Sequence, residues 1–142
     1  MSLWLCLRFD QLPLQCLSRC EQQPVVVLAA QRVIRANDCA AALGIRHGMG
    51  AATVRALAGE EPVRLLQRDE QAEQRCLQQL CCWAYSITPT LCTWQVDCLQ
   101  LEIGGCLSLF RGLDTLLLEV DSGIGSRGYS VHYGLASTPK AA

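Results

Sequence analysis

The chain has 142 residues, of which 51% are apolar, enough to bury one core or one domain with a small insertion. Its formal net charge is −1 and its isoelectric point is about 6.1, so no domain-wide positive field exists and any contact with nucleic acid must be local. The N-terminal apolar run is too short to span a membrane and the ten cysteines include no Cys-x-x-Cys pair, so we expect a cytoplasmic protein whose thiols are mostly buried and bind no metal.

The first half of the chain predicts short strands that alternate with short helices. Leu3, Leu5 and Leu7 alternate as on one face of a strand, and the run PVVVLAA is typical of a strand buried on both faces. Asn37 is placed to cap a helix, which Gly44 would end in a left-handed conformation. The elements expected here are strands over residues 3–9, 24–30 and 62–66, a strand that includes Val33 and Ile34, a helix over 12–20 and two short helices between 37 and 59.

The second half predicts the clearest helix of the chain. Asp69 would cap it, and apolar residues from Ala72 to Ala84 recur at helical spacing. A later helix is expected to be broken up by Gly123 and Gly125. The other expected elements are a hairpin over 90–94 and 98–103, that weaker helix over 111–122 and a strand over 129–135. This order predicts an α+β fold of the ferredoxin-like kind, a mixed or antiparallel sheet with helices on one face and a small helical insertion.

Five segments in this order carry a resemblance to a known family: LWLCLRFDQLPLQCL, QPVVVLAAQRVIRAND, RANDCAAALGIRHGM, ITPTLCTWQVDCLQLEIGG and GYSVHYGLASTPKAA. Together they resemble the first half of a Y-family translesion DNA polymerase of the UmuC/DinB kind. They look closest to the ImuB-type polymerase-like subunit of bacterial mutagenesis cassettes. The resemblance implies a polymerase palm over residues 1–30 and 68–142, truncated at its end, with a fingers-like insertion over 31–67.

The resemblance also implies where catalytic carboxylates would lie, and these positions depart from the family pattern. The first metal-binding Asp of the family falls on Arg8, while Asp10 matches a second acid that does not bind metal. The paired acids of the later hairpin fall on Asp97 and Cys98, or on 94–96 if the gap lies elsewhere; Asp97 also suits a hairpin turn. A guanidinium about 4 Å from a divalent ion would replace attraction by repulsion on the order of several kcal/mol. We therefore expect no intact metal site.

The positions implied for the nucleotide are altered as well. The Tyr and Arg that hold the triphosphate in the family fall on Asp38 and Ala41, and the residue that screens the sugar falls on Pro13. The backbone frame of the fingers is retained, and it makes Arg32, Gly48 and Met49 tentative DNA-contacting residues, although Gly48 could equally serve only a turn.

These departures lead to the hypothesis of a catalytically degenerate module in DNA repair, translesion synthesis and SOS-induced mutagenesis, an N-terminal fragment that needs no cofactor. By resemblance its partners are DNA, bound weakly, and a sliding clamp, a RecA-like accessory protein and a mutagenic polymerase, contacted mostly through regions beyond this chain. Two alternatives stay open. One is an active Mg²⁺-dependent polymerase that uses Asp10, Asp97 and Glu102, and the other is a protein-interaction domain without DNA contact.

Overall fold

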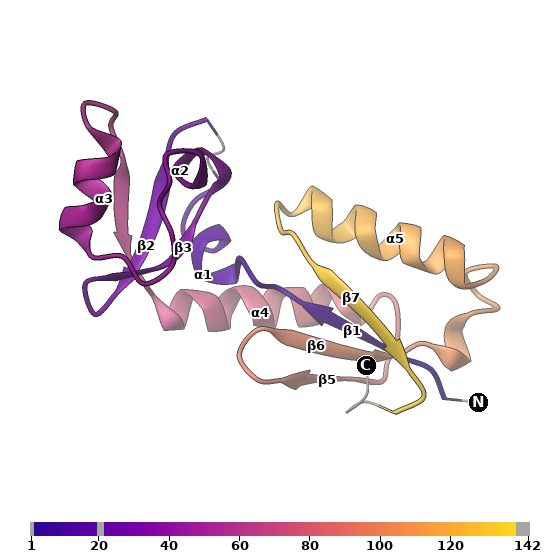
Figure 1. The fold of residues 1–142 in the computed structure, drawn as a ribbon. Helices are drawn as coiled ribbons and strands as arrows, with labels where there is room; N and C mark the ends of the chain where they lie inside the picture. The colour runs from indigo at the N-terminus through magenta and orange to yellow at the C-terminus, as the bar shows by residue number, and fades with distance from the viewer. Residues whose placement is uncertain (1, 20–21, 139–142) are drawn as a thin grey trace. The chain divides into compact units, whose positions relative to one another are not determined.

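The computed structural model describes residues 2–19 and 22–138 and divides the chain into two compact units (Figure 1). Unit 1 comprises Met1–Leu12 and Glu73–Ala142, and unit 2 comprises Pro13–Ala72. Unit 2 is thus inserted between the first strand of unit 1 and the helix that follows. The predicted palm and fingers segments have other boundaries, since residues 24–30 were expected with the first strand and lie instead in unit 2; their assignment as palm and fingers stays a prediction.

Unit 1 is built on a four-stranded antiparallel sheet. Its strand order is β5 (Leu91–Trp94), β6 (Cys98–Glu102), β1 (Trp4–Arg8) and β7 (His132–Ala136). The helices are α4 (Glu70–Ala84), α5 (Leu113–Ser126) and a short 3₁₀ turn, η1 (Gly104–Cys106). The order of elements and strands confirms the predicted α+β class, a ferredoxin-like sheet made from two strand–helix–strand halves.

One face of this sheet forms the core of unit 1. Leu5 and Leu7 of β1 lie opposite Leu101 and Leu99 of β6 in the strand register, and all four side chains are fully buried. Tyr133 of β7 lies opposite Leu7, and its hydroxyl donates a hydrogen bond of 2.6 Å to Asp121 Oδ1 of α5. Because directly paired residues point to the same side of a sheet, α5 covers the face that carries the leucines.

The two helices of unit 1 touch at a glycine, which corrects the prediction that glycines break up the second helix. A Cβ atom built on Gly123 would lie 2.6 Å from Trp83 Cε2, so only glycine allows α4 this close to α5. The contact outweighs the low helix propensity of glycine, and α5 continues without interruption to Ser126. Arg127 stacks over the same Trp83 ring at 5.3 Å.

Unit 2 contains a three-stranded sheet with β2 (Val25–Ala29) in the centre. Its neighbours are the antiparallel β3 (Arg32–Ala36) and the parallel β4 (Arg64–Gln67). The valines of β2 are fully buried, as the run PVVVLAA predicted. The helices are α1 (Leu12–Gln15), α2 (Asp38–Ala42) and α3 (Ala51–Ala58). The prediction of a helix over 12–20 was too long, because the N–H groups of Leu17 and Ser18 both turn back to the Leu14 carbonyl.

The ends of α2 in unit 2 agree with those predicted from the sequence. Asn37 Oδ1 accepts a hydrogen bond from the N–H of Ala40 at 3.0 Å, which confirms Asn37 as the cap of α2. The same oxygen accepts the N–H of Val25, and the amide nitrogen donates to the Gln23 carbonyl, so one side chain ties the helix to the start of β2. Gly44 follows α2 with φ +91°, as expected of a left-handed stop.

The cysteines correct another expectation. The nine described cysteines are free thiols, but only Cys6, Cys98 and Cys106 are buried, and Cys82 and Cys92 are exposed. The prediction that most would be buried was wrong, because several lie on the outer turns of α4 and on the edge strand β5. In the described parts of the chain, no helix is long and apolar enough to cross a membrane.

Candidate functional site

Two predicted catalytic positions, Arg8 and Cys98, meet with His132 at one end of the unit 1 sheet. Arg8, the last residue of β1, lies opposite Cys98 of β6 and opposite His132 of β7. Since strand side chains alternate, all three point to the face away from Leu7 and the helices. The register thus places Arg8 beside the hairpin position predicted for the paired acids.

Two carboxylates stand close to Arg8. Asp97 directly precedes Cys98, and its carbonyl accepts the N–H of Phe9 at 2.9 Å, which fastens the hairpin end to the chain just after β1. Asp10 Oδ2 lies 3.1 Å from His132 Nε2, an ion pair when the imidazole is protonated. The sequence gives no sign of the contact between His132 and Asp10, because strand register is not visible there.

The Arg8 guanidinium determines the electrostatics of the side chains at this end of the sheet. The hydrogen bond to Cys98 contributes most to raising the pKa of Arg8, and the nearby Asp97 carboxylate raises it further, so the side chain stays a cation. Burial raises the pKa of Cys98 to about 11, against a smaller opposing effect of Arg8. A fixed cation beside a neutral thiol is a poor ligand set for a divalent ion, which prefers carboxylate oxygens.

Glu102 lies away from this group. It pairs with Trp4 at the other end of β1, four residues from Arg8 or about 13 Å along the strand. Its Oε1 accepts the N–H of Leu3 at 3.2 Å and that of Gly104 at 2.7 Å. The first of these bonds contributes most to lowering the pKa of Glu102. The structure therefore does not bring Glu102 together with Asp10 and Asp97, and within residues 2–19 and 22–138 no three His, Cys, Asp or Glu side chains form a group that could hold a metal.

The positions predicted for the nucleotide lie in unit 2. Asp38 and Ala41 are exposed on α2, three residues apart and so on one side of the helix. Asp38 stands in the first helical turn, where a carboxylate suits the helix dipole whether or not a ligand is near. Pro13 is buried in α1.

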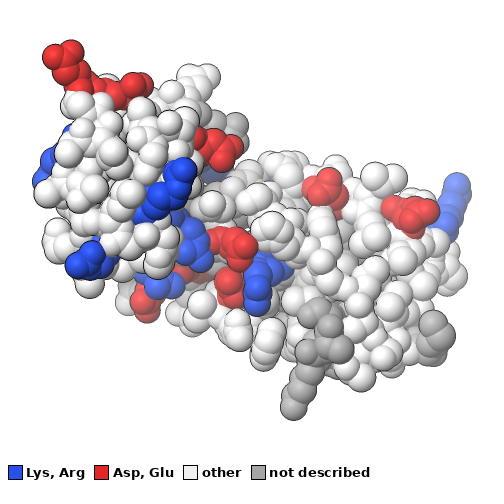
Figure 2. Space-filling model, in the orientation of Figure 1, with Lys and Arg blue, Asp and Glu red and all other residues white. Residues whose placement is uncertain are grey.

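The tentative DNA-contacting residues come together around the loop before α3. Arg32 Nη1 donates to the Gly48 carbonyl at 2.8 Å, and the carbonyl of Met49 accepts the N–H of Val33 at 2.9 Å. Met49 packs against the core that includes Val26 and Val54. Arg32 remains exposed, and Figure 2 shows blue side chains scattered over unit 2 on the visible face, with red ones among them.

The comparisons with known proteins agree with this architecture. Residues 10–142 match the model of the impB/mucB/samB family. No functionally curated protein matches the sequence significantly. Among solved structures, the chain is similar to an insertion ternary complex of Dbh DNA polymerase (TM-score 0.74, 16% identity) and to DinB from Sulfolobus solfataricus (TM-score 0.70, 15% identity). A Y-family polymerase chimera of Dbh and Dpo4 is also similar (TM-score 0.74, 16% identity). Each match covers 94% of this chain but only 42% of the other, so the chain spans less than half the length of these structures.

Proposed function

The chain belongs to the impB/mucB/samB family, and from this premise we propose that it is a Y-family polymerase-like module that serves translesion synthesis without transferring nucleotides itself. The similarity of its fold to solved Y-family polymerases supports this proposal. The finer assignment is a catalytically degenerate subunit of the ImuB type, active in SOS-induced mutagenesis in the cytoplasm.

One observation carries the proposal of lost catalysis: Arg8 stands in register with Cys98 at the strand ends. Nucleotidyl transfer of the polymerase kind uses two divalent ions that clamp the attacking and leaving oxygens. At this place the chain offers Asp97 and the His132-paired Asp10, with a guanidinium between β6 and β7. The guanidinium repels a divalent ion and neutralises part of the carboxylate charge, and Glu102 is too far along β1 to compensate.

What remains is a scaffold that presents a polymerase-shaped surface. We propose that it contacts primer–template DNA weakly through the arginines of unit 2, among them Arg32, because seven arginines there are offset by six acids. Its further partners would be a sliding clamp, a RecA-like accessory protein and an active mutagenic polymerase, engaged mainly through other regions of the assembly. Its role would then be to bring these partner proteins together.

The test is to restore the carboxylate. The Arg8→Asp variant and the double variant Arg8→Asp with Cys98→Glu are compared with the natural chain by Mn²⁺ titration calorimetry. We expect no saturable Mn²⁺ binding by the natural chain and a dissociation constant of about 1 mM or below for a variant. Arg111→Asp, which adds the same charge at another exposed position, is the control and should gain nothing. Circular dichroism checks that each variant is folded.

Primer extension with Mg²⁺ and Mn²⁺ completes the test. Metal-dependent extension by the natural chain that disappears in Asp97→Ala would overturn the proposal and support the active polymerase. Salt-sensitive primer–template binding without extension is the expected result. Failure to bind DNA at low salt would instead favour the domain that contacts only proteins.

A further inference from the structure

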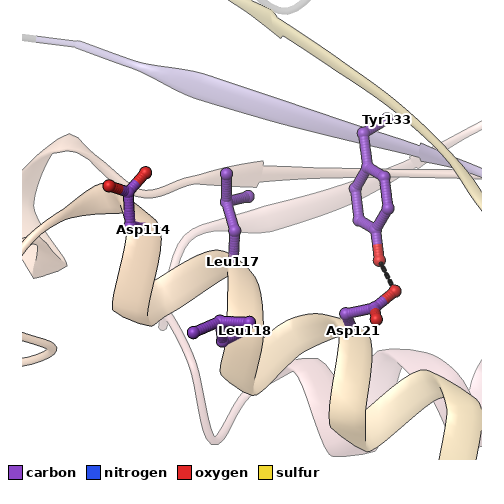
Figure 3. Close-up of a pocket in the computed structure, with 5 residues that line it drawn as sticks. All are labelled: Asp114, Leu117, Leu118, Asp121 and Tyr133. Atoms are coloured by element: carbon purple, nitrogen blue, oxygen red, sulfur yellow. Dashed lines mark hydrogen bonds between the residues drawn. The ribbon is translucent and has the colours of Figure 1, made fainter.

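A hollow opens on unit 1 between α5 and the edge of the sheet, on the face opposite to Arg8. It measures about 470 Å³ and is lined by Asp114, Leu117, Leu118 and Asp121 of α5 and by Tyr133 of β7. This volume lies within the range of ligand and peptide sites. In Figure 3 the leucines lie between Asp114 at one end and the pair of Asp121 and Tyr133 at the other.

The floor of the hollow is apolar and exposed. The Leu118 side chain is 70% exposed and the Tyr133 side chain 44% exposed, although both residues are large. Tyr133 lies on β7, an edge strand of the described sheet, and its ring is only partly covered. Covering apolar side chains of this size on binding is favourable. The hollow therefore offers much of the apolar area that a docked segment needs.

Negative charge marks both ends of the hollow. Asp114 and Asp121 are seven residues apart on α5, which is two helical turns or about 10.5 Å. The hydrogen bond from the Tyr133 hydroxyl fixes the Asp121 carboxylate at the rim of the hollow, and burial of the ring together with that carboxylate raises the pKa of Tyr133. Figure 2 shows the surface over α5 as mostly white with separate red carboxylates, and blue at one end.

We propose that this hollow binds an amphipathic helical segment of a partner protein that carries an apolar anchor between two basic residues. The anchor would lie on Leu117, Leu118 and the Tyr133 ring, and two Lys or Arg side chains seven residues apart would reach Asp114 and Asp121. A helix matches the spacing because its own two turns also span about 10.5 Å. A second copy of this chain fits less well, since a two-fold contact would set these carboxylates against each other. The proposal is independent of whether the chain is catalytic.

The test identifies peptides that bind the hollow without assuming their sequence in advance. Random 12-residue peptides displayed on phage are panned on the natural chain, and enriched peptides are measured by fluorescence anisotropy. We expect enriched sequences with a Leu, Ile, Phe or Met between basic residues six to eight positions apart. Leu118→Ser should weaken their binding about tenfold or more. Asp114→Asn and Asp121→Asn should each weaken it about threefold, and Asp121→Asn keeps an oxygen for the Tyr133 hydroxyl.

Leu109→Ser is the matched control, because Leu109 is 80% exposed and lies outside the hollow. It should leave peptide affinity unchanged. The proposal is wrong if no peptide is enriched, if enriched peptides lack basic residues, or if Leu118→Ser binds them as tightly as the natural chain. Self-association in sedimentation that Leu118→Ser abolishes would also overturn it, and would assign the hollow to a second copy.

Discussion

The two faces of the unit 1 sheet differ in what they carry. The face under the helices holds Leu5, Leu7, Leu99 and Leu101, all fully buried, whereas the opposite face presents the strand-end group around Arg8. Both faces belong to the same strands, since a strand directs alternate residues to opposite sides. A change of chemistry on one face therefore leaves the packing on the other intact. This separation allows the fold to persist when the charge of the residue at the end of β1 changes.

The first test compares side-chain truncations on the two faces of the sheet, and it has the largest expected effect. Leu101→Ala removes a buried side chain of β6 and should lower the free energy of unfolding by about 2–5 kcal/mol. Arg8→Ala, on the exposed side of the neighbouring strand, should change it by about 0.5 kcal/mol or less. Urea unfolding followed by circular dichroism measures both. Equal losses would show that the strand-end group stabilises the fold as much as the core does.

A second test addresses the helix layer over the leucine face. Gly123→Ala places a methyl group against the Trp83 ring and should destabilise the protein by about 1–3 kcal/mol through overpacking. Gly125→Ala is the matched control, because no atom lies within 4 Å of its added Cβ, and the gain in helix propensity should stabilise by up to about 1 kcal/mol. Thermal unfolding of the two variants should therefore shift in opposite directions. Similar shifts would mean that Trp83 moves aside freely.

The third test uses pH, because Cys98 is a buried thiol next to the Arg8 guanidinium. Its folded pKa of about 11 lies above the ordinary value of 9.0, so the folded state keeps the thiol proton when the unfolded state loses it. The resulting stabilisation is complete below pH 9 and lost as the pH rises towards 11, by at most about 3 kcal/mol.

Serine does not ionise in this range, so the stability of Cys98→Ser should fall less steeply between pH 9 and 11 than that of the natural chain. The difference between the two urea-unfolding curves cancels the contributions of other cysteines and tyrosines. Parallel curves would contradict the burial of this thiol.

The elements set by local residues could be predicted from the sequence. Asp69 Oδ1 accepts the N–H of Ala72, and Asn37 caps α2, because a capping side chain acts within three residues of itself. The alternation of Leu5 and Leu7 likewise marked a strand with one buried face. The prediction that Gly123 and Gly125 break up α5 was wrong. Gly123 packs against Trp83, which lies forty residues earlier in the chain, and this contact is not visible in the local sequence.

The candidate site was predictable only as a set of positions. The resemblance selected Arg8, Asp97 and Cys98, and the strand register brings these three together. The pairing of His132 with Asp10 could not be predicted, because it depends on β7 lying next to β1 across more than a hundred residues. The hollow beside Tyr133 could not be predicted either, because it depends on how α5 packs against β7. Pairings at such separation leave no periodic signal in the sequence.

The insertion of unit 2 also fixes an order in which the chain can be completed on the ribosome. β1 emerges first, yet both of its neighbours in the sheet come from residues 98–102 and 132–136. Unit 2 contains every strand of its own sheet within residues 25–67, so its strands are all available while β1 still waits with two unpaired edges. The leucines of that strand stay uncovered until residues 98–102 and 132–136 have been synthesised, a period in which an apolar edge invites association with other chains. The insertion after β1 therefore raises the risk of association in the nascent chain, whereas the folded protein has these leucines buried.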